Sequence, residues 1–149
     1  MTTLAFERAV YDRIVAHARE GAPREVCGVL GGHREGPTAT VTVARRVANV
    51  ADHPESRYEL DPAEQVWVMD EMEESGREVV GFYHSHPRGP DRPSGVDEAR
   101  ATWEGHSYCI VSLAGEEREG RTGAPTVGSW RWTGEGFEQE AVEVRGQSA

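Results

Sequence analysis

The sequence contains no lysine, so all 16 of its basic residues are arginine. Acidic residues number 26, and the formal net charge at pH 7 is −10. A chain with this charge repels phosphate groups, so we expect no nucleic-acid partner. Without lysine, only the α-amino group is left for any machinery that builds amide links onto amines.

Cysteine is also scarce. The two cysteines, Cys27 and Cys109, form no Cys-x-x-Cys pair, which argues against a thiolate zinc cluster. Each lies in a short apolar run that is typical of a strand, so we expect buried, reduced thiols. A cysteine nucleophile is the alternative, and a structural disulfide fits poorly with an intracellular protein.

Long apolar runs are missing as well. No stretch approaches the ~20 apolar residues that a membrane helix needs, so we expect no membrane partner. Residues 1–6 lack the basic and apolar segments of a secretory signal, which favours a cytoplasmic location. The 149 residues suit one domain, which we expect to span residues 1–145, with a frayed tail at residues 146–149.

Apolar periodicity predicts the secondary structure. The predicted helices are 3–20, 61–75 and 94–103. The predicted strands are 26–30, 38–47, 57–60, 79–84, 107–112, 127–132 and 137–144. Because helices and strands alternate at first and strands dominate the end, we predict an α/β (mixed α+β) fold with a mixed sheet flanked by helices.

His84 and His86 lie two residues apart in a predicted strand and are followed by Pro87. Side chains at i and i+2 of a strand share a face, so both imidazoles can reach one metal ion. Pro87 cannot donate to a sheet ladder, so the pair should lie at a strand end. Asp97 follows after ten residues of loop and early helix, enough for the chain to turn back. Two imidazoles and one carboxylate leave a fourth position open, as in catalytic zinc sites.

Two further residues have both a chemical and a structural interpretation. Ser94 and Asp97 match the spacing of a capping box, so both could serve the start of a helix, although a serine there can still face a cleft. Glu25 precedes the first predicted apolar strand and is a candidate base for a metal-activated water. The alternative for Glu25 is a solvated surface acid.

Taken together, these residues resemble the signature of the JAMM (MPN-plus) zinc metalloproteases: Glu25, His84-Ser85-His86-Pro87, Ser94 and Asp97. The resemblance implies that His84, His86 and Asp97 bind one zinc ion. It further implies that Glu25 is the general acid/base and that Ser94 donates a hydrogen bond to the developing oxyanion. The family fold is a mixed sheet flanked by helices and is related to that of cytidine deaminases.

Within this family the chain resembles the small archaeal and bacterial members. Its acidic, lysine-free composition is similar to that of salt-loving archaea and points toward the haloarchaeal desampylases, although a GC-rich bacterial genome also depletes lysine. The implied activity is a zinc-dependent isopeptidase or peptidase. It would cleave ubiquitin-like small archaeal modifier proteins from target lysines, or linear fusions after a C-terminal Gly-Gly. Two alternatives stay open: a peptidase that releases cysteine or another amino acid from a sulfur-carrier protein, and a non-catalytic MPN scaffold module. The oligomeric state is not indicated.

Overall fold

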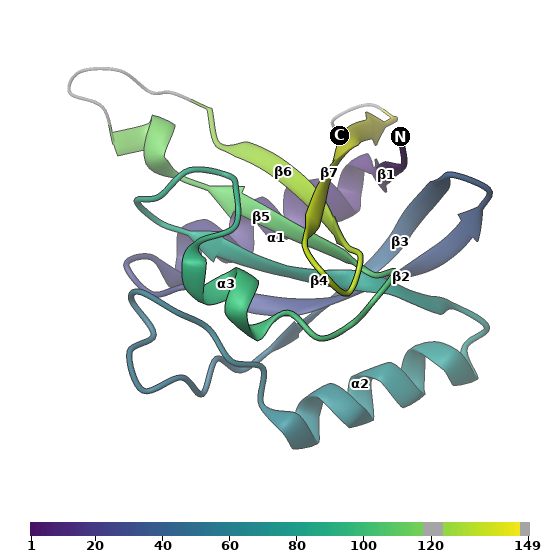
Figure 1. Cartoon of the computed structure of the whole chain (residues 1–149), viewed down its shortest axis with the longest axis horizontal. Coiled ribbons are helices and arrows are strands. Elements are labelled where there is room, and N and C mark those ends of the chain that lie inside the picture. Colours follow the sequence, from purple (N-terminus) through teal and green to yellow (C-terminus); the bar gives the residue numbers. More distant parts are fainter. Residues whose placement is uncertain (118–123, 147–149) are drawn as a thin grey trace.

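The computed structural model describes residues 1–117 and 124–146 (Figure 1). Its strands are β1 (Thr3–Glu7), β2 (Cys27–Glu35), β3 (Thr38–Val47), β4 (Glu78–His86), β5 (Ser107–Ser112), β6 (Thr126–Trp132) and β7 (Phe137–Arg145). Its helices are α1 (Arg8–Gly21), α2 (Pro62–Glu74), α3 (Gly95–Arg100) and the 3₁₀ turn η1 (Ala114–Glu117). Within the described part of the chain, no helix is long and apolar enough to cross a membrane.

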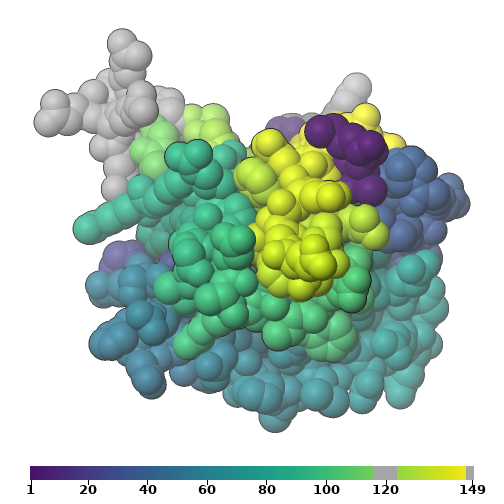
Figure 2. Space-filling view, viewed as in Figure 1, coloured from purple at the N-terminus to yellow at the C-terminus, as the bar shows by residue number. Residues whose placement is uncertain are grey.

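All seven strands belong to one mixed sheet that closes on itself. The strand order is β1-β3-β2-β4-β5-β6-β7, and β1 completes the ring by pairing in parallel with both β3 and β7. The β4–β5 pair is also parallel, and the remaining neighbours are antiparallel. Figure 2 shows the first residues, in purple, beside the last strand, in yellow. The predicted mixed sheet with packed helices is therefore confirmed, whereas its closure was not predicted.

Some of the predicted boundaries were wrong. Residues Thr3–Glu7 form β1 and not the start of a helix, because Leu4, Ala5 and Phe6 are buried in the sheet that this strand closes. The predicted strand at 57–60 is a loop, in which Leu60 makes only an isolated bridge to Asn49. The helix predicted over 94–103 ends at Arg100. Beyond Gly146, the frayed tail expected at 146–149 lies outside the described residues.

The two long helices pack on opposite faces of the sheet. Val10, Ile14 and Ala18 of α1 share a buried cluster with Tyr83 of β4. On the other face, Val68 and Met72 of α2 pack in a second cluster with Phe82. Because side chains alternate along a strand, His84 and His86 lie on the same face as Phe82.

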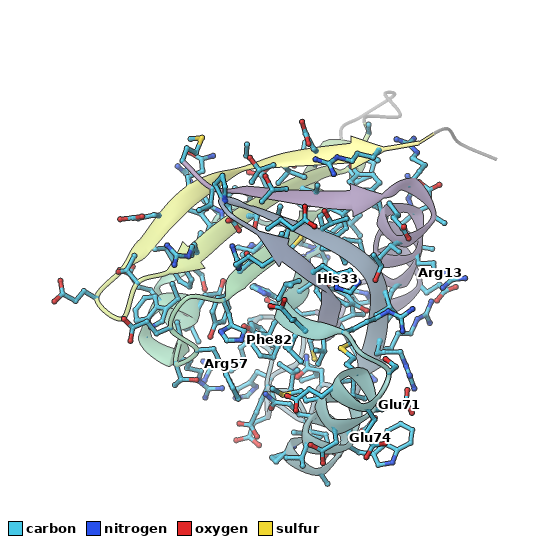
Figure 3. The ribbon with its side chains drawn as sticks, turned by 90° about the vertical axis from the view of Figure 1, so that its right-hand side faces the viewer. Arg13, His33, Arg57, Glu71, Glu74 and Phe82 are labelled. Atoms are coloured by element: carbon cyan, nitrogen blue, oxygen red, sulfur yellow. The ribbon has the colours of Figure 1, made fainter. Side chains whose placement is uncertain are left out.

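An ion pair also joins α2 to the sheet. Arg45 of β3 pairs with Glu71 of α2. Figure 3 labels Glu71 and, one turn further along this helix, the exposed Glu74. Both groups are partly exposed, so the pair contributes little to stability compared with the apolar cluster beneath it.

Gly81 allows β4 to lie close against β5, since a Cβ at this position would overlap the carbonyl oxygen of Ser107. We predict that Gly81→Ala lowers the free energy of unfolding by about 1–3 kcal/mol, the usual cost of overpacking. Gly136→Ala is the matched control, because a Cβ there meets no atom within 4 Å. The control should be neutral or stabilising by up to ~1 kcal/mol. Equal urea midpoints for the two variants would contradict the close approach.

Candidate active site

The pairing of β2 with β4 brings Glu25 to the histidines. Their antiparallel register sets Cys27 opposite His84, and the same register, continued two residues before the start of β2, sets Glu25 opposite His86. Two hydrogen bonds extend the pairing: Val26 N donates to Ser85 Oγ (2.8 Å), and Ser85 N donates to Val26 O (3.0 Å). Directly opposed residues share a face of the sheet, so Glu25 lies on the side of the two imidazoles.

Three potential metal ligands meet at the end of β4. His84 Nε2 lies 3.1 Å from His86 Nε2 and 3.1 Å from Asp97 Oδ2, and the third side of this triangle, from His86 Nε2 to Asp97 Oδ2, is 3.0 Å. All three residues are buried. Separations of this size suit atoms that each lie ~2.0–2.2 Å from one shared ion.

The backbone fixes the proton on His86. Its Nδ1 lies 2.7 Å from the carbonyl oxygen of Pro90. A carbonyl oxygen only accepts, so Nδ1 carries a proton. Nε2 can then donate to Asp97 while the ring is doubly protonated, and presents its lone pair to a metal ion once that second proton is lost. Histidines that bind metals are commonly oriented by an outer hydrogen bond of this kind.

Asp97 belongs both to the triangle and to the start of α3. Ser94 Oγ accepts from Asp97 N (3.1 Å), and Asp97 Oδ2 accepts from Ser94 N (2.9 Å), so the capping box is present. Burial acts to raise the pKa of Asp97, but its hydrogen bonds with His84 and His86 outweigh burial and hold that pKa well below the usual range. Asp97 is therefore an anion at neutral pH.

Glu25 is the second carboxylate near the histidines, and it differs from Asp97 in distance and in charge. One of its carboxylate oxygens lies within 4.8 Å of the ring nitrogens of His84 and His86, whereas Asp97 contacts both rings directly at 3.0–3.1 Å. Its side chain is buried, and Oε1 has no hydrogen-bond partner among the described residues. Burial raises the pKa of Glu25 to about 7; the charge of His86 opposes this shift and that of Asp97 adds to it. The direct contacts thus make Asp97 the candidate third ligand, and leave Glu25 as a candidate proton acceptor beside the two imidazoles.

Cys27 lies next to the site but is unsuited to nucleophilic chemistry. Cys27 and Cys109 are both buried, and neither forms a disulfide. Burial raises the pKa of the Cys27 thiol to about 12, so the thiolate is scarce at neutral pH. The structure therefore does not favour the alternative of a cysteine nucleophile.

Three contributors to the site were not identified from the sequence. The ring of Tyr58 stacks on His84, with centroids 4.1 Å apart and planes at 20°. The Pro90 carbonyl orients His86, and the Asn49 side chain binds the backbone of Glu25. Tyr58 lies in a segment that was predicted as a strand and is a loop, Asn49 lies just before this loop, and a carbonyl group has no sequence signature.

Two cavities flank the triangle. One, of about 430 Å³, includes Tyr58 and Asp97 and is otherwise mainly apolar. The other, of about 480 Å³, is lined by Glu25, His86 and Ser94, together with Arg88 and Arg92 from the loop after β4. Each cavity thus reaches one member of the triangle, Asp97 in the first and His86 in the second.

Comparison with known proteins identifies relatives of this chain. The model of the prokaryotic homologs of the JAB domain matches residues 7–132. The chain is 44% identical to the desampylase of Haloferax volcanii, over 89% of this chain and 90% of that protein. It is 33% identical to the CysO-cysteine peptidase of Mycobacterium tuberculosis, over 77% of each. A solution structure of a Desulfitobacterium hafniense protein superposes with a TM-score of 0.83 at 30% identity, covering 97% of this chain and 94% of that chain.

The raised pKa of Glu25 makes a prediction for the metal-free protein. In the folded chain this carboxyl holds its proton up to about pH 7, compared with about 4.5 when unfolded. The folded state thus binds more protons between these values, and this group lowers the free energy of unfolding as the pH rises through them. We predict that Glu25→Gln is more stable relative to wild type at pH 8 than at pH 5, measured by urea unfolding with a chelator. An equal difference at the two pH values would contradict the assignment.

Proposed function

The chain belongs to the prokaryotic JAB-domain family, and on this premise we propose that it is a zinc-dependent isopeptidase of the JAMM type. It cleaves ubiquitin-like small archaeal modifier proteins from target lysines, and linear fusions after a C-terminal Gly-Gly, in the cytoplasm and as a single domain. The observation that carries the proposal is the triangle of His84, His86 and Asp97 with Glu25 beside it. The similarity to a desampylase supports the substrate class.

The residues of the triangle would hold one zinc ion per chain. Two imidazole nitrogens and one carboxylate oxygen are a donor set that catalytic zinc uses. The hydrogen bond from His86 Nδ1 to the Pro90 carbonyl leaves Nε2 free to bind the ion. Glu25 Oε1 has no hydrogen-bond partner among the described residues, so it can accept a hydrogen bond from water. When bound, zinc supplies Lewis-acid polarisation of the scissile carbonyl and lowers the pKa of water at the site.

Glu25 carries the proton of the reaction. Its carboxylate takes a proton from the attacking water as the C–O bond forms. As the C–N bond of the isopeptide breaks, the same carboxyl gives that proton to the ε-amine of the leaving lysine. Burial favours the protonated form of this group and so eases the uptake of a proton from water.

Ser94 supports the developing oxyanion. Its Oγ accepts from Asp97 N in the capping box, and this leaves the O–H free to donate. Ser94 also lines the cavity that contains Glu25 and His86. The serine therefore serves the helix start and the reaction with different parts of one hydroxyl group.

A second candidate uses the same chemistry with another leaving group. The similarity to the CysO-cysteine peptidase favours a peptidase that releases cysteine or another amino acid from a sulfur-carrier protein. Incubation of the enzyme with each substrate class separates the two candidates. The third alternative, a non-catalytic scaffold module, is disfavoured because the ligand triangle and Glu25 are all present.

The proposal is tested by mass spectrometry of a modifier–lysine conjugate, incubated with the enzyme in the presence and absence of a chelator. We expect release of a modifier ending in Gly-Gly and of the unmodified target lysine, and suppression of both by the chelator. Persistence of the intact conjugate with zinc-loaded enzyme would overturn the proposed substrate, and cleavage in the presence of the chelator would overturn the zinc chemistry.

Glu25 and Asp97 should fail in different ways when they are replaced. We predict that Glu25→Gln keeps its zinc but loses roughly 10²–10⁴-fold in kcat, because the proton carrier is removed. Asp97→Ala should lose both zinc and activity, while the sheet still folds. Zinc content, circular dichroism and kcat measure this difference. An Asp97→Ala protein that retains zinc and cleaves conjugates would refute the ligand assignment.

Ser94→Gly separates the two roles of this serine. Glycine is nearly as good as serine at a helix N-cap, with a loss of only a few tenths of a kcal/mol. The missing O–H should lower kcat by about 10²-fold or more, with little change in KM. Ser94→Thr keeps the hydroxyl and should recover most of the rate. A wild-type kcat in the glycine variant would refute the role of Ser94 at the oxyanion and leave only its role as a helix cap.

A further inference from the structure

The Asn49 side chain makes four hydrogen bonds to backbone groups beside the site. Its Nδ2 donates to the carbonyls of Glu25 (2.9 Å) and Arg57 (3.1 Å). Its Oδ1 accepts from the N–H groups of Ala51 and Glu59, each at 3.0 Å. Two donors and two acceptor sites are the full capacity of a primary amide, and no other side chain of this length offers both.

The hydrogen bond from Asn49 to the Glu25 carbonyl helps to fix the proposed general base. Glu25 precedes β2, so its peptide groups lie outside the main part of the ladder. Asn49 holds the carbonyl of Glu25, and the backbone oxygen of Pro54, in the loop that follows Asn49, accepts from Glu25 N at 2.6 Å. Both ends of this residue are therefore held by one loop, which sets the direction of its carboxylate.

The hydrogen bonds that Asn49 makes with Arg57 and Glu59 fix the backbone of Tyr58. The Arg57 carbonyl and the Glu59 N–H belong to the two peptide groups that flank Tyr58, and Asn49 binds both. Figure 3 labels Arg57 in this loop. The ring that these contacts hold is the one that stacks on His84 at 4.1 Å. The base of the loop is closed by Val50 N donating to Glu59 O (2.9 Å).

We propose that Asn49 is a positioning residue, which sets the general base Glu25 and the metal ligand His84, through Tyr58, with a single side chain. Its effect on turnover rests on the proposed function, whereas its effect on metal binding does not. Removing its two donors frees both elements of the site together. Outer contacts of this kind are worth 10–100-fold in metal affinity or activity elsewhere.

The test is Asn49→Asp, which keeps the shape and the Oδ1 acceptor but places an oxygen against the carbonyls of Glu25 and Arg57. We expect kcat per zinc-loaded protein to fall on the order of 10–100-fold with KM little changed. We also expect zinc affinity, measured by competition with a chromophoric chelator at a temperature well below the unfolding midpoint, to fall about 10-fold. Wild-type kcat and zinc affinity in a variant that is merely less stable would overturn the proposal.

The matched control is Thr133→Ala in the turn between β6 and β7. Thr133 Oγ1 donates to Gly136 O and accepts from the N–H groups of Glu135 and Gly136, so it too organises a turn, but it lines neither cavity beside the triangle. We expect this variant to lose stability while kcat and zinc affinity stay at the wild-type values. An equal loss of zinc affinity in the control would show general loosening and overturn the role of Asn49.

Tyr58 supplies a second test that does not depend on the folding of the Asn49 variant. Tyr58→Ala should weaken zinc binding to a similar degree, and Tyr58→Phe, which keeps the ring, should rescue it. Unchanged affinity in Tyr58→Ala would overturn the link to His84. If the wild-type protein binds zinc but cleaves no modifier conjugate, the proposed function fails, and these affinities still decide the role of Asn49.

Discussion

The register between β2 and β4 is the constraint on which the site depends. Pairing Cys27 with His84 sets Glu25 against His86, and a slip of one residue would turn these side chains to opposite faces of the sheet. Close packing holds the register, because a Cβ at Gly28 would overlap both the Tyr83 ring and the carbonyl of Arg45. Backbone pairing in the central sheet thus places Glu25 beside the two imidazoles, and the neighbouring loops then orient Glu25 and His86.

The carboxylate of Asp97 couples the fold to the site. Its Oδ2 accepts from Ser94 N in the capping box and also lies 3.0–3.1 Å from the ligand nitrogens of His84 and His86. A helix of six residues is marginal by itself, so α3 depends on contacts such as these. Cation binding at the triangle and the folding of α3 should therefore support each other. The loop between β4 and α3 joins the same network, because Pro90 of that loop orients His86.

Local chemistry made much of this predictable from the sequence. The His-x-His spacing in a strand and the Ser94–Asp97 spacing at a helix start both act over a few residues, and each is present as expected. The strand β1 was missed because its partner β7 is distant in the sequence, and local periodicity cannot report such a pairing. Asn49 and Tyr58 were missed for a related reason. Their contacts depend on the path of the loop through space, which local sequence patterns do not report.

We propose that His84, His86 and Asp97 bind one zinc ion while Glu25 stays outside its coordination sphere. Anomalous diffraction at the zinc edge, from crystals of the zinc-loaded protein, tests this directly. We expect one peak per chain, ~2.0–2.2 Å from His84 Nε2, His86 Nε2 and Asp97 Oδ2, with both oxygens of Glu25 beyond bonding distance. A peak bonded to Glu25 in place of Asp97, or no peak between the two imidazoles, would contradict the account.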